Sequence, residues 1–368
     1  MVWLSPNIVK ADLIKYEPVS KPPQMTGSTP TPDDKHESLL WAMNAAALGY
    51  YSQGRYEEAE SGFRKMLEIS DILLGEKHPT STLLMGNFAW FCYNRGRWIE
   101  AESLLETIVK LRRELGLEED LDSLAFMANL GMLYTEQARY DKAETVLVKV
   151  LEERRRLLGE AHEATLCSIS DLAILYTAQD RFKEGEILFG KTIELGRLLL
   201  DEDHPTILSF VNRQALLYRN QDRNDEAEKL LTQVLDTRRN KLGEDDPETL
   251  QTMNDLGVLY ARQDRVSDAE SLLTKALEAR RIKLGEEHPD TLESSHELGV
   301  LCTNQSRYEE AEPLLLKSFE GRTERLRANH PATLDSADRL VQLYEGWGKT
   351  EKAEQWRAKL PDEKRFKQ

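Results

Sequence analysis

Histidines beside acidic residues are the first candidates for chemistry in this chain. His288 follows two glutamates and precedes a proline in the stretch LGEEHPDTL, and His78, His204 and His330 also precede a proline. A histidine next to carboxylates can bind a metal ion or act as a general base. A polar side chain followed by proline is also typical of the start of a helix. The spacing of these residues decides between the two interpretations.

A histidine or an aspartate recurs at a constant interval of 42 residues. The positions are His36, His78, Asp120, His162, His204, Asp246, His288 and His330. A fixed period of this length is the signature of stacked helical repeats. Side chains that occur once per repeat lie along one edge of the stack, whereas metal ligands must converge on one point. We therefore predict that these residues cap helices and are neither metal ligands nor catalytic groups.

Each 42-residue unit has the pattern of two helices. Counting from the histidine or aspartate as step 0, apolar residues fall at steps 10, 13 and 14 and again at steps 20, 23, 27 and 31, the spacing of one helical face. We expect helices at about steps 1–17 and 20–38. Alanine at step 23, replaced once by Gly185, lets two helices approach closely. Glycine at step 39 fits the left-handed residue that ends a helix, and Arg238 and Arg280 are assigned to the dipole of the last turns.

These patterns predict an all-α fold, a right-handed α-solenoid of eight helical hairpins over residues 36–368. Residues 1–35 are expected to be irregular, because the stretch EPVSKPPQMTGSTPTPDD is a Pro- and Thr-rich linker. The preceding stretch MVWLSPNIV is unusually apolar for a disordered tail. It either packs on the first unit or binds back into the groove of its own chain, which a flexible linker of this length permits.

Composition narrows the classes of partner and compartment. The formal net charge of −16 disfavours nucleic acid and anionic membrane surfaces, which both attract basic proteins. Cys92, Cys167 and Cys302 are too few for a disulfide framework in 368 residues. No apolar run approaches the roughly 20 residues that cross a bilayer. We expect a soluble cytoplasmic protein without a cofactor or metal.

The repeat resembles the tetratricopeptide repeat. The motif Leu-Gly-x-x-Tyr, followed by alanine nine residues after the tyrosine, is present as LGVLY at 256–260 with Ala269. The 42-residue period, with LGEEHPDTL between units and RYEEAEPLL opening the second helix, is similar to kinesin light chains and to the repeat arrays of fungal NTPase receptors. The resemblance covers about residues 36–360. No heptad coiled coil precedes the repeats in residues 1–35, and the resemblance implies the scaffold alone.

The resemblance implies a concave groove lined by the first helix of each unit. In kinesin light chains, asparagines in this groove contact peptide backbone and basic residues contact acidic motifs that contain tryptophan. We therefore predict a protein–protein interaction scaffold that binds an extended acidic peptide with an aromatic anchor. Arg219 and Arg262 are expected to hold a carboxylate. The other predicted contacts are Asn212, Asn220, Asn254 and Asn304 for backbone and Trp41, Trp90 and Tyr93 for the anchor. The alternatives are solvated polar positions and, for Trp41, packing against its own unit.

One histidine lies outside the 42-residue series. His296 falls on the same predicted face, one helical turn after Glu293, and Asn304 and Arg262 are expected nearby. A histidine oriented by a carboxylate is the minimal arrangement of a general base, so a small-molecule site for proton transfer or isomerisation is the alternative function. No nucleophile accompanies the pair, and we expect that the chain is not an enzyme.

Overall fold

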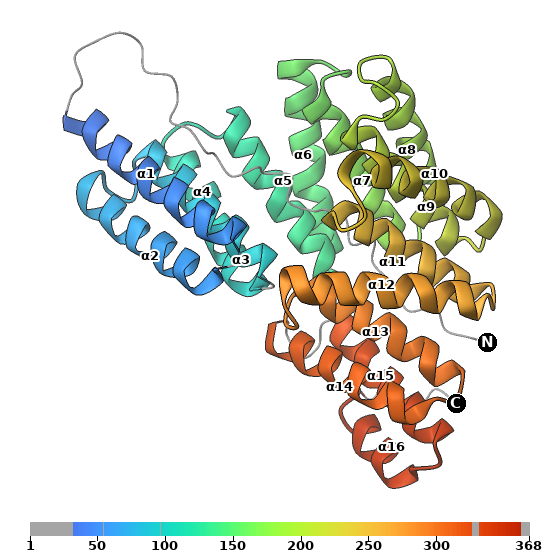
Figure 1. Ribbon diagram of the computed structural model, residues 1–368. Helices are drawn as coiled ribbons and strands as arrows, with labels where there is room; N and C mark the ends of the chain where they lie inside the picture. The colour runs from blue at the N-terminus through green and yellow to red at the C-terminus, as the bar shows by residue number, and fades with distance from the viewer. Residues whose placement is uncertain (1–31, 54, 96, 326–330, 362–368) are drawn as a thin grey trace. The chain divides into compact units, whose positions relative to one another are not determined.

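The structure is a computed structural model that describes residues 32–53, 55–95, 97–325 and 331–361. The described residues form two compact units, an N-terminal unit (32–160) and a C-terminal unit (161–361) (Figure 1). The N-terminal unit contains α1 (Pro32–Ser52), α2 (Tyr56–Leu73), α3 (Pro79–Asn94), α4 (Trp98–Glu114), α5 (Leu121–Glu136) and α6 (Tyr140–Leu158). The C-terminal unit contains α7 (Glu163–Ala178), α8 (Phe182–Arg197), α9 (Pro205–Asn220), α10 (Asn224–Leu242), α11 (Pro247–Arg262), α12 (Val266–Leu284), α13 (Pro289–Asn304), α14 (Tyr308–Arg325), α15 (Pro331–Gly346) and α16 (Thr350–Arg357).

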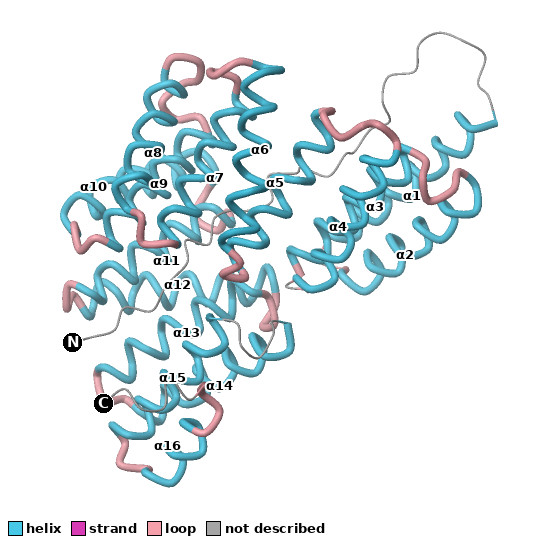
Figure 2. The backbone as a smooth tube through the Cα atoms, turned by 180° about the vertical axis from the view of Figure 1, so that it is seen from behind, coloured by secondary structure: helices cyan, strands magenta, loops and turns pink. Residues whose placement is uncertain are grey.

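Consecutive helices pack in pairs within each unit, from α1 with α2 to α15 with α16, and Figure 2 shows helices joined by short loops throughout the described part of the chain. The predicted all-α solenoid of helical hairpins is confirmed. The first helix α1 begins at Pro32, five residues before the start at residue 37 that the repeat predicts, and the fixed φ of proline suits the first turn of a helix. The irregular segment was predicted over residues 1–35. Residues 32–35 belong instead to α1, and residues 1–31, which include the predicted self-binding stretch, lie outside the described residues.

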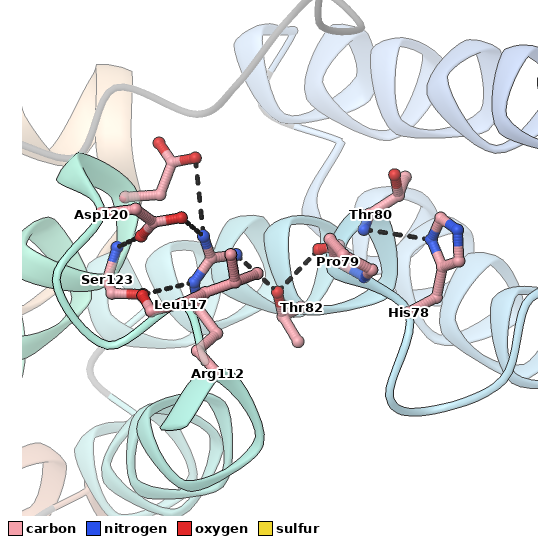
Figure 3. Close-up of polar contacts among 9 residues, drawn as sticks. His78, Pro79, Thr80, Thr82, Arg112, Leu117, Asp120 and Ser123 are labelled. Carbon is pink, nitrogen blue, oxygen red and sulfur yellow. Dashed lines mark hydrogen bonds and ion pairs between the residues drawn. The ribbon is translucent and has the colours of Figure 1, made fainter. Parts of the chain in front are cut away.

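The predicted capping residues open the first helices of the hairpins. The Nδ1 atom of His78 accepts a hydrogen bond from the main-chain N–H of Thr80 at 3.2 Å (Figure 3). The same cap is made by Asp120, His162, His204, Asp246 and His288. His36 is an exception and corrects the prediction, because the early start of α1 places it inside the helix. His330 lies outside the described residues.

Small residues occupy the crossing point of the two helices in each hairpin. The alanines at step 23, Ala59, Ala101, Ala143, Ala227, Ala269, Ala311 and Ala353, are at most 1% exposed. A Cβ atom on Gly185 would lie 2.9 Å from Thr177 Oγ1 and 3.0 Å from Leu217 Cδ1, so this crossing is closer still. Glycines end several second helices with positive φ, as at Gly159 (85°) and Gly243 (94°). These features confirm the predicted roles of steps 23 and 39.

A repeated ion pair explains the recurrence of arginine at step 19 and glutamate at step 24. Arg223 lies over the ring of Tyr218, 3.9 Å from its centroid, and donates to Glu186 of the preceding hairpin at 2.9 Å. Arg265 repeats both contacts with Tyr260 and Glu228. Each pair therefore ties the start of one second helix to the second helix of the preceding hairpin, by stacking as well as by charge.

Buried arginines at step 34 join one hairpin to the next, which the sequence analysis missed. Arg280 on α12 is 1% exposed and donates to the carbonyl oxygen of Asp290 (2.9 Å), to Ser294 Oγ (2.8 Å) and to Gln251 Oε1 (2.6 Å). Arg112 in the N-terminal unit donates to Ser123 Oγ (2.6 Å) and Thr82 Oγ1 (2.8 Å) (Figure 3). These guanidinium groups are structural connections, because their hydrogen bonds end on neighbouring helices of the same unit.

Candidate peptide-binding site

The predicted arginines and most of the predicted asparagines lie on one face of the C-terminal unit. The first helices α9, α11, α13 and α15 of four successive hairpins contact each other in order. We call the surface that they form the first-helix face. Its polar residues considered below are Asn212 and Arg219 on α9, Asn254, Asp255 and Arg262 on α11, His296 and Asn304 on α13, and Asp335 and Arg339 on α15.

Arg219 and Arg262 are brought together at the ends of α9 and α11. The guanidinium of Arg262 donates to the main-chain carbonyl oxygen of Arg219 at 3.1 Å. Burial, followed by the positive charge of Arg219, lowers the pKa of Arg262 to about 10, against the raising effect of Glu297. Within the described part of the chain, neither arginine has a carboxylate oxygen within 4 Å, in contrast to the arginines that tie the hairpins together. The pair is thus a concentration of positive charge that an anion would stabilise.

Arg219 is largely enclosed. Arg219 is 3% exposed, and its Nε atom has no hydrogen-bond partner among the described residues. A buried donor that lacks a partner is costly, and such groups are concentrated at functional sites. Arg262 is more exposed than Arg219 and would meet a ligand first.

Asp255 on α11 lies close enough to Arg219 for the charge of the arginine to act on its carboxyl group. It is 5% exposed and accepts hydrogen bonds from Asn212 Nδ2 (3.0 Å) and Gln251 Nε2 (3.2 Å). Burial raises the pKa of Asp255 to about 6, although the charge of Arg219 and the hydrogen bond from Asn212 act in the opposite direction. Sequence reasoning missed this residue, because its role depends on which face of α11 it shares with its neighbours.

The four predicted asparagines differ in accessibility. Asn212 and Asn254 are buried, and Asn254 Oδ1 accepts a hydrogen bond from Ser294 at 2.9 Å. The Oδ1 atom of Asn212 has no partner among the described residues. Asn220 is partly exposed and Asn304 is exposed, each as the last residue of its helix. Asn220 and Asn304 are therefore the asparagines best placed to contact a peptide without a rearrangement.

His296 has a different partner from the predicted one. Its Nε2 lies 2.9 Å from Asp335 Oδ2 on α15, whereas Glu293 points to Arg280 at 3.8 Å. Burial would raise the pKa of Asp335, but the hydrogen bond and charge of His296, together with Arg339, outweigh it and hold that pKa below its ordinary value. The predicted Glu293–His296 pair was wrong, since contacts between helices override the spacing along one helix. His296 is 1% exposed, so a substrate could not reach it without an opening of this face.

The predicted aromatic anchor lies in the N-terminal unit. Trp41 on α1 is 3% exposed, and its Nε1 has no hydrogen-bond partner within the described ranges. The rings of Trp90 and Tyr51 meet edge to face at 4.8 Å, and Tyr93 stacks on Trp98 at 5.8 Å. Trp90 and Tyr93 remain partly exposed, so they are the members of the group that a ligand could contact.

Three further observations bear on the kind of site. The described residues contain no cluster of three or more histidines, cysteines or carboxylates that could hold a metal ion. None of the helices that the structure describes has the length and apolar character needed to cross a membrane. Cys92 and Cys302 occupy the tyrosine step and are buried, and burial raises the pKa of the Cys92 thiol to about 12, as for a packing residue.

Comparison with known proteins identifies the family. The family model described as tetratricopeptide repeat matches residues 38–114, 122–197, 203–282, 268–320 and 290–357. The chain belongs to the tetratricopeptide repeat family. The resemblance inferred from the 42-residue motif is thereby confirmed at the level of family and fold. No curated protein matches the chain.

Several solved tetratricopeptide-like structures are similar to this chain. The nearly identical TPR-like repeats of a putative kinesin light chain from Podosopora anserina are 24% identical, with 56% of this chain and 98% of that chain covered and a TM-score of 0.47. NprR in complex with its cognate peptide NprX is 14% identical, with 88% and 84% covered and a TM-score of 0.62. A Rap protein complexed with Competence and Sporulation Factor is 10% identical, with 88% and 97% covered and a TM-score of 0.61. At these identities the likeness to NprR and to the Rap protein shows a shared fold.

Proposed function

We propose that this tetratricopeptide protein is an interaction scaffold whose first-helix face binds an extended acidic segment of a partner protein. The observation that carries the proposal is the pair Arg219 and Arg262, which lie together without a carboxylate partner among the described residues. A carboxylate from the partner would supply the missing counter-charge, and a planar guanidinium suits it because it donates two parallel hydrogen bonds.

The remaining residues of the face would fix the direction of the bound segment. Asn220 and Asn304 can each donate to and accept from a peptide backbone, and they end the helices α9 and α13 on either side of α11. NprR, which has this fold, was solved with its cognate peptide. Peptide binding is therefore compatible with the architecture, and the charge of the first-helix face suggests which peptides this chain selects.

The aromatic residues of the N-terminal unit would form a separate contact. Trp90 and Tyr93 are partly exposed and rest on Tyr51 and Trp98, which hold their rings in place. Such supported rings are suited to an aromatic or aliphatic side chain of a partner. We infer this role for Trp90 and Tyr93, whereas the buried position of Trp41 favours packing.

A selection experiment with random peptides in place of the partner tests the proposal. A displayed library of random dodecapeptides is selected in parallel on the full chain and on the Arg262→Gln variant. Arg262 is the appropriate position, because Arg219 is too buried for a substitution that changes charge. A matched control, Arg281→Gln, removes a charge from the second helix of the same hairpin, where Arg281 pairs with Glu286 at 3.2 Å.

We expect sequences rich in Asp and Glu from the wild-type chain and from Arg281→Gln, and loss of that enrichment with Arg262→Gln. Acidic enrichment that persists in Arg262→Gln would contradict the assignment to this face. Enrichment of uncharged sequences alone would contradict the acidic class of ligand.

A further inference from the structure

The first hairpin of the chain lacks both of two arginines that four other hairpins carry next to each other. At step 34 the buried arginines are Arg112, Arg154, Arg238 and Arg280, with Arg322 partly buried. At step 35 the arginines pair with a glutamate five residues later, as Arg113–Glu118, Arg155–Glu160, Arg197–Glu202, Arg239–Glu244 and Arg281–Glu286. In the first hairpin these two positions are Ser70 and Asp71, while the acidic partner remains as Glu76.

A cavity is present at this place. It has a volume of about 200 Å³ and is lined by Leu67, Ser70, Asp71, Glu76, Ser81 and Met85, from α2, the following loop and α3. The corresponding residues of the next hairpin are Val109, Arg112, Arg113, Glu118, Ser123 and Met127. Two of the wall positions, Ser70 and Asp71, are thus those of the two arginines one repeat further on.

The fourth hairpin shows that the loss of an arginine at step 34 need not leave a space. Its residue there is Gly196, and a Cβ atom on Gly196 would lie 2.4 Å from Cδ1 of Ile207. Ile207 replaces the serine or threonine found at step 3 of the other first helices from α3 to α15, so its side chain fills the position. At Ser70 no such replacement has occurred, because the step-3 residue is still a serine, Ser81.

The groups that bind a guanidinium in the next hairpin are kept in the first one. Ser123 Oγ accepts from Arg112 Nε at 2.6 Å and donates to the carbonyl oxygen of Leu117 at 2.6 Å (Figure 3). Its counterpart Ser81 donates to the carbonyl oxygen of Gly75 at 2.8 Å, and in place of the arginine it receives a hydrogen bond from Ser70 at 2.9 Å. Ser81 thus keeps the position of the acceptor Ser123, although the arginine that would donate to it is replaced by Ser70.

The charge at the cavity is unbalanced. Asp71 and Glu76 are both exposed, and within the described part of the chain neither has an ion-pair partner within 4 Å. At the corresponding positions Arg113 Nε lies 3.4 Å from Glu118. Two carboxylates therefore face the position that a cation occupies in the repeat, with serine hydroxyl groups at its inner end.

We propose that the cavity between α2 and α3 binds an arginine side chain of a partner polypeptide. The guanidinium would occupy the position of the missing arginines, with charge-assisted hydrogen bonds to Asp71 and Glu76 and its stem against Leu67 and Met85. Free arginine is disfavoured, because its own α-carboxylate would approach the two acidic side chains. The site is independent of the acidic-peptide site of the C-terminal unit.

Methyl NMR on the full chain tests the site directly. Methionine methyl groups are labelled with carbon-13, and N-acetyl-L-arginine methylamide is added as the probe. We expect a saturable shift of the Met85 methyl resonance, with a Kd on the order of 1–10 mM for a single side chain. Met127, which lines the same position beside Arg112 and Arg113, is the internal control and should not move.

Three comparisons make the result decisive. The citrulline analogue has the same shape without the charge and should not bind, and free L-arginine should bind more weakly than the blocked probe. Asp71→Asn should weaken binding at least about threefold, since it removes one charged acceptor. Asp71→Arg places a guanidinium of the chain beside Glu76, as in the next hairpin, and should abolish binding; both substitutions are at an exposed residue.

The proposal is overturned by a Met85 resonance that stays fixed up to about 50 mM probe, well above the expected Kd. Equal shifts with the citrulline analogue would show that charge is not recognised. Binding that survives Asp71→Arg would place the probe elsewhere. Tighter binding of free L-arginine than of the blocked probe would identify an amino-acid site and exclude the polypeptide source.

Discussion

Arg262 donates a hydrogen bond to the main-chain carbonyl oxygen of Arg219, at 3.1 Å. The acceptor belongs to the last turn of α9, where carbonyl groups carry partial negative charge, and it also accepts from the main-chain N–H of Asp222 at 3.1 Å. This contact fixes a second cationic side chain beside Arg219, although burial and like charge both disfavour it. The stacking of first helices thus builds a positive site on a chain whose net charge is −16.

The stability of the protein should depend on pH through Asp255. Its pKa is raised to about 6, chiefly by burial, above the 3.8 of an unperturbed aspartate. The folded state therefore binds more protons than the unfolded state between about pH 4 and 6. Asp255 therefore contributes to stability at pH values below this window. As the pH rises through 6, this contribution of about 2–3 kcal/mol is lost.

Urea unfolding between pH 4 and 7 measures this contribution in the wild type and in Asp255→Asn. As the pH rises across this window, the free energy of unfolding of the wild type should fall relative to that of Asp255→Asn. Asp236→Asn, at an exposed position of α10, is the control and should give a constant difference. A constant difference for Asp255→Asn as well would contradict the raised pKa.

Adjacent arginines on α12 should differ strongly in their effect on stability. Arg280 is 1% exposed and makes three hydrogen bonds, one to Gln251 on α11 and two to α13, so Arg280→Met leaves several buried acceptors without a donor. We expect a loss of about 2–4 kcal/mol.

The matched substitution Arg281→Met removes a surface ion pair with Glu286 and should cost less than about 1 kcal/mol. Both losses are measured by chemical denaturation of the full chain. Similar losses for the two variants would show that burial of Arg280 does not determine its contribution.

The residue between the two helices of a hairpin should prefer glycine. Ala138 has φ of 55°, in the left-handed region, and its counterpart Gly348 has φ of 73°. Ala138→Gly should therefore stabilise the protein by about 0.5–1 kcal/mol, because glycine adopts this conformation without a steric cost.

Ala45→Gly is the matched control, because Ala45 is exposed within α1 and the same change should destabilise by about 1 kcal/mol. Thermal unfolding of the two variants gives opposite shifts of Tm if backbone conformation is the cause. A lower Tm for both would contradict this explanation.

The sequence predicted what repeats every 42 residues, and missed what depends on contacts between helices. The capping role of His78 and the positive φ of Gly159 followed from one unit, because both are set by the local chain. The partner of His296 could not be found in this way: Asp335 belongs to the next first helix, 39 residues later, and only the packing of α13 against α15 brings it near.

The buried arginines are an intermediate case. Arg238 and Arg280 were assigned to the helix dipole, yet each is fully buried and hydrogen-bonded to a neighbouring first helix. A signal was present, because arginine recurs at step 34 in five units. Periodicity identifies such a position, but whether its side chain points into the core depends on the serine and threonine residues of the next hairpin.

A double-mutant cycle between Arg262 and a peptide carboxylate tests the central claim most directly. An acidic peptide obtained by selection on the wild-type chain, and its counterparts with single Asp→Asn or Glu→Gln changes, are titrated calorimetrically into the wild type and Arg262→Gln. We predict that one carboxylate shows a coupling free energy of about 1–3 kcal/mol with Arg262. Strictly additive effects for every carboxylate, with unchanged binding by Arg262→Gln, would contradict an anion site at Arg219 and Arg262.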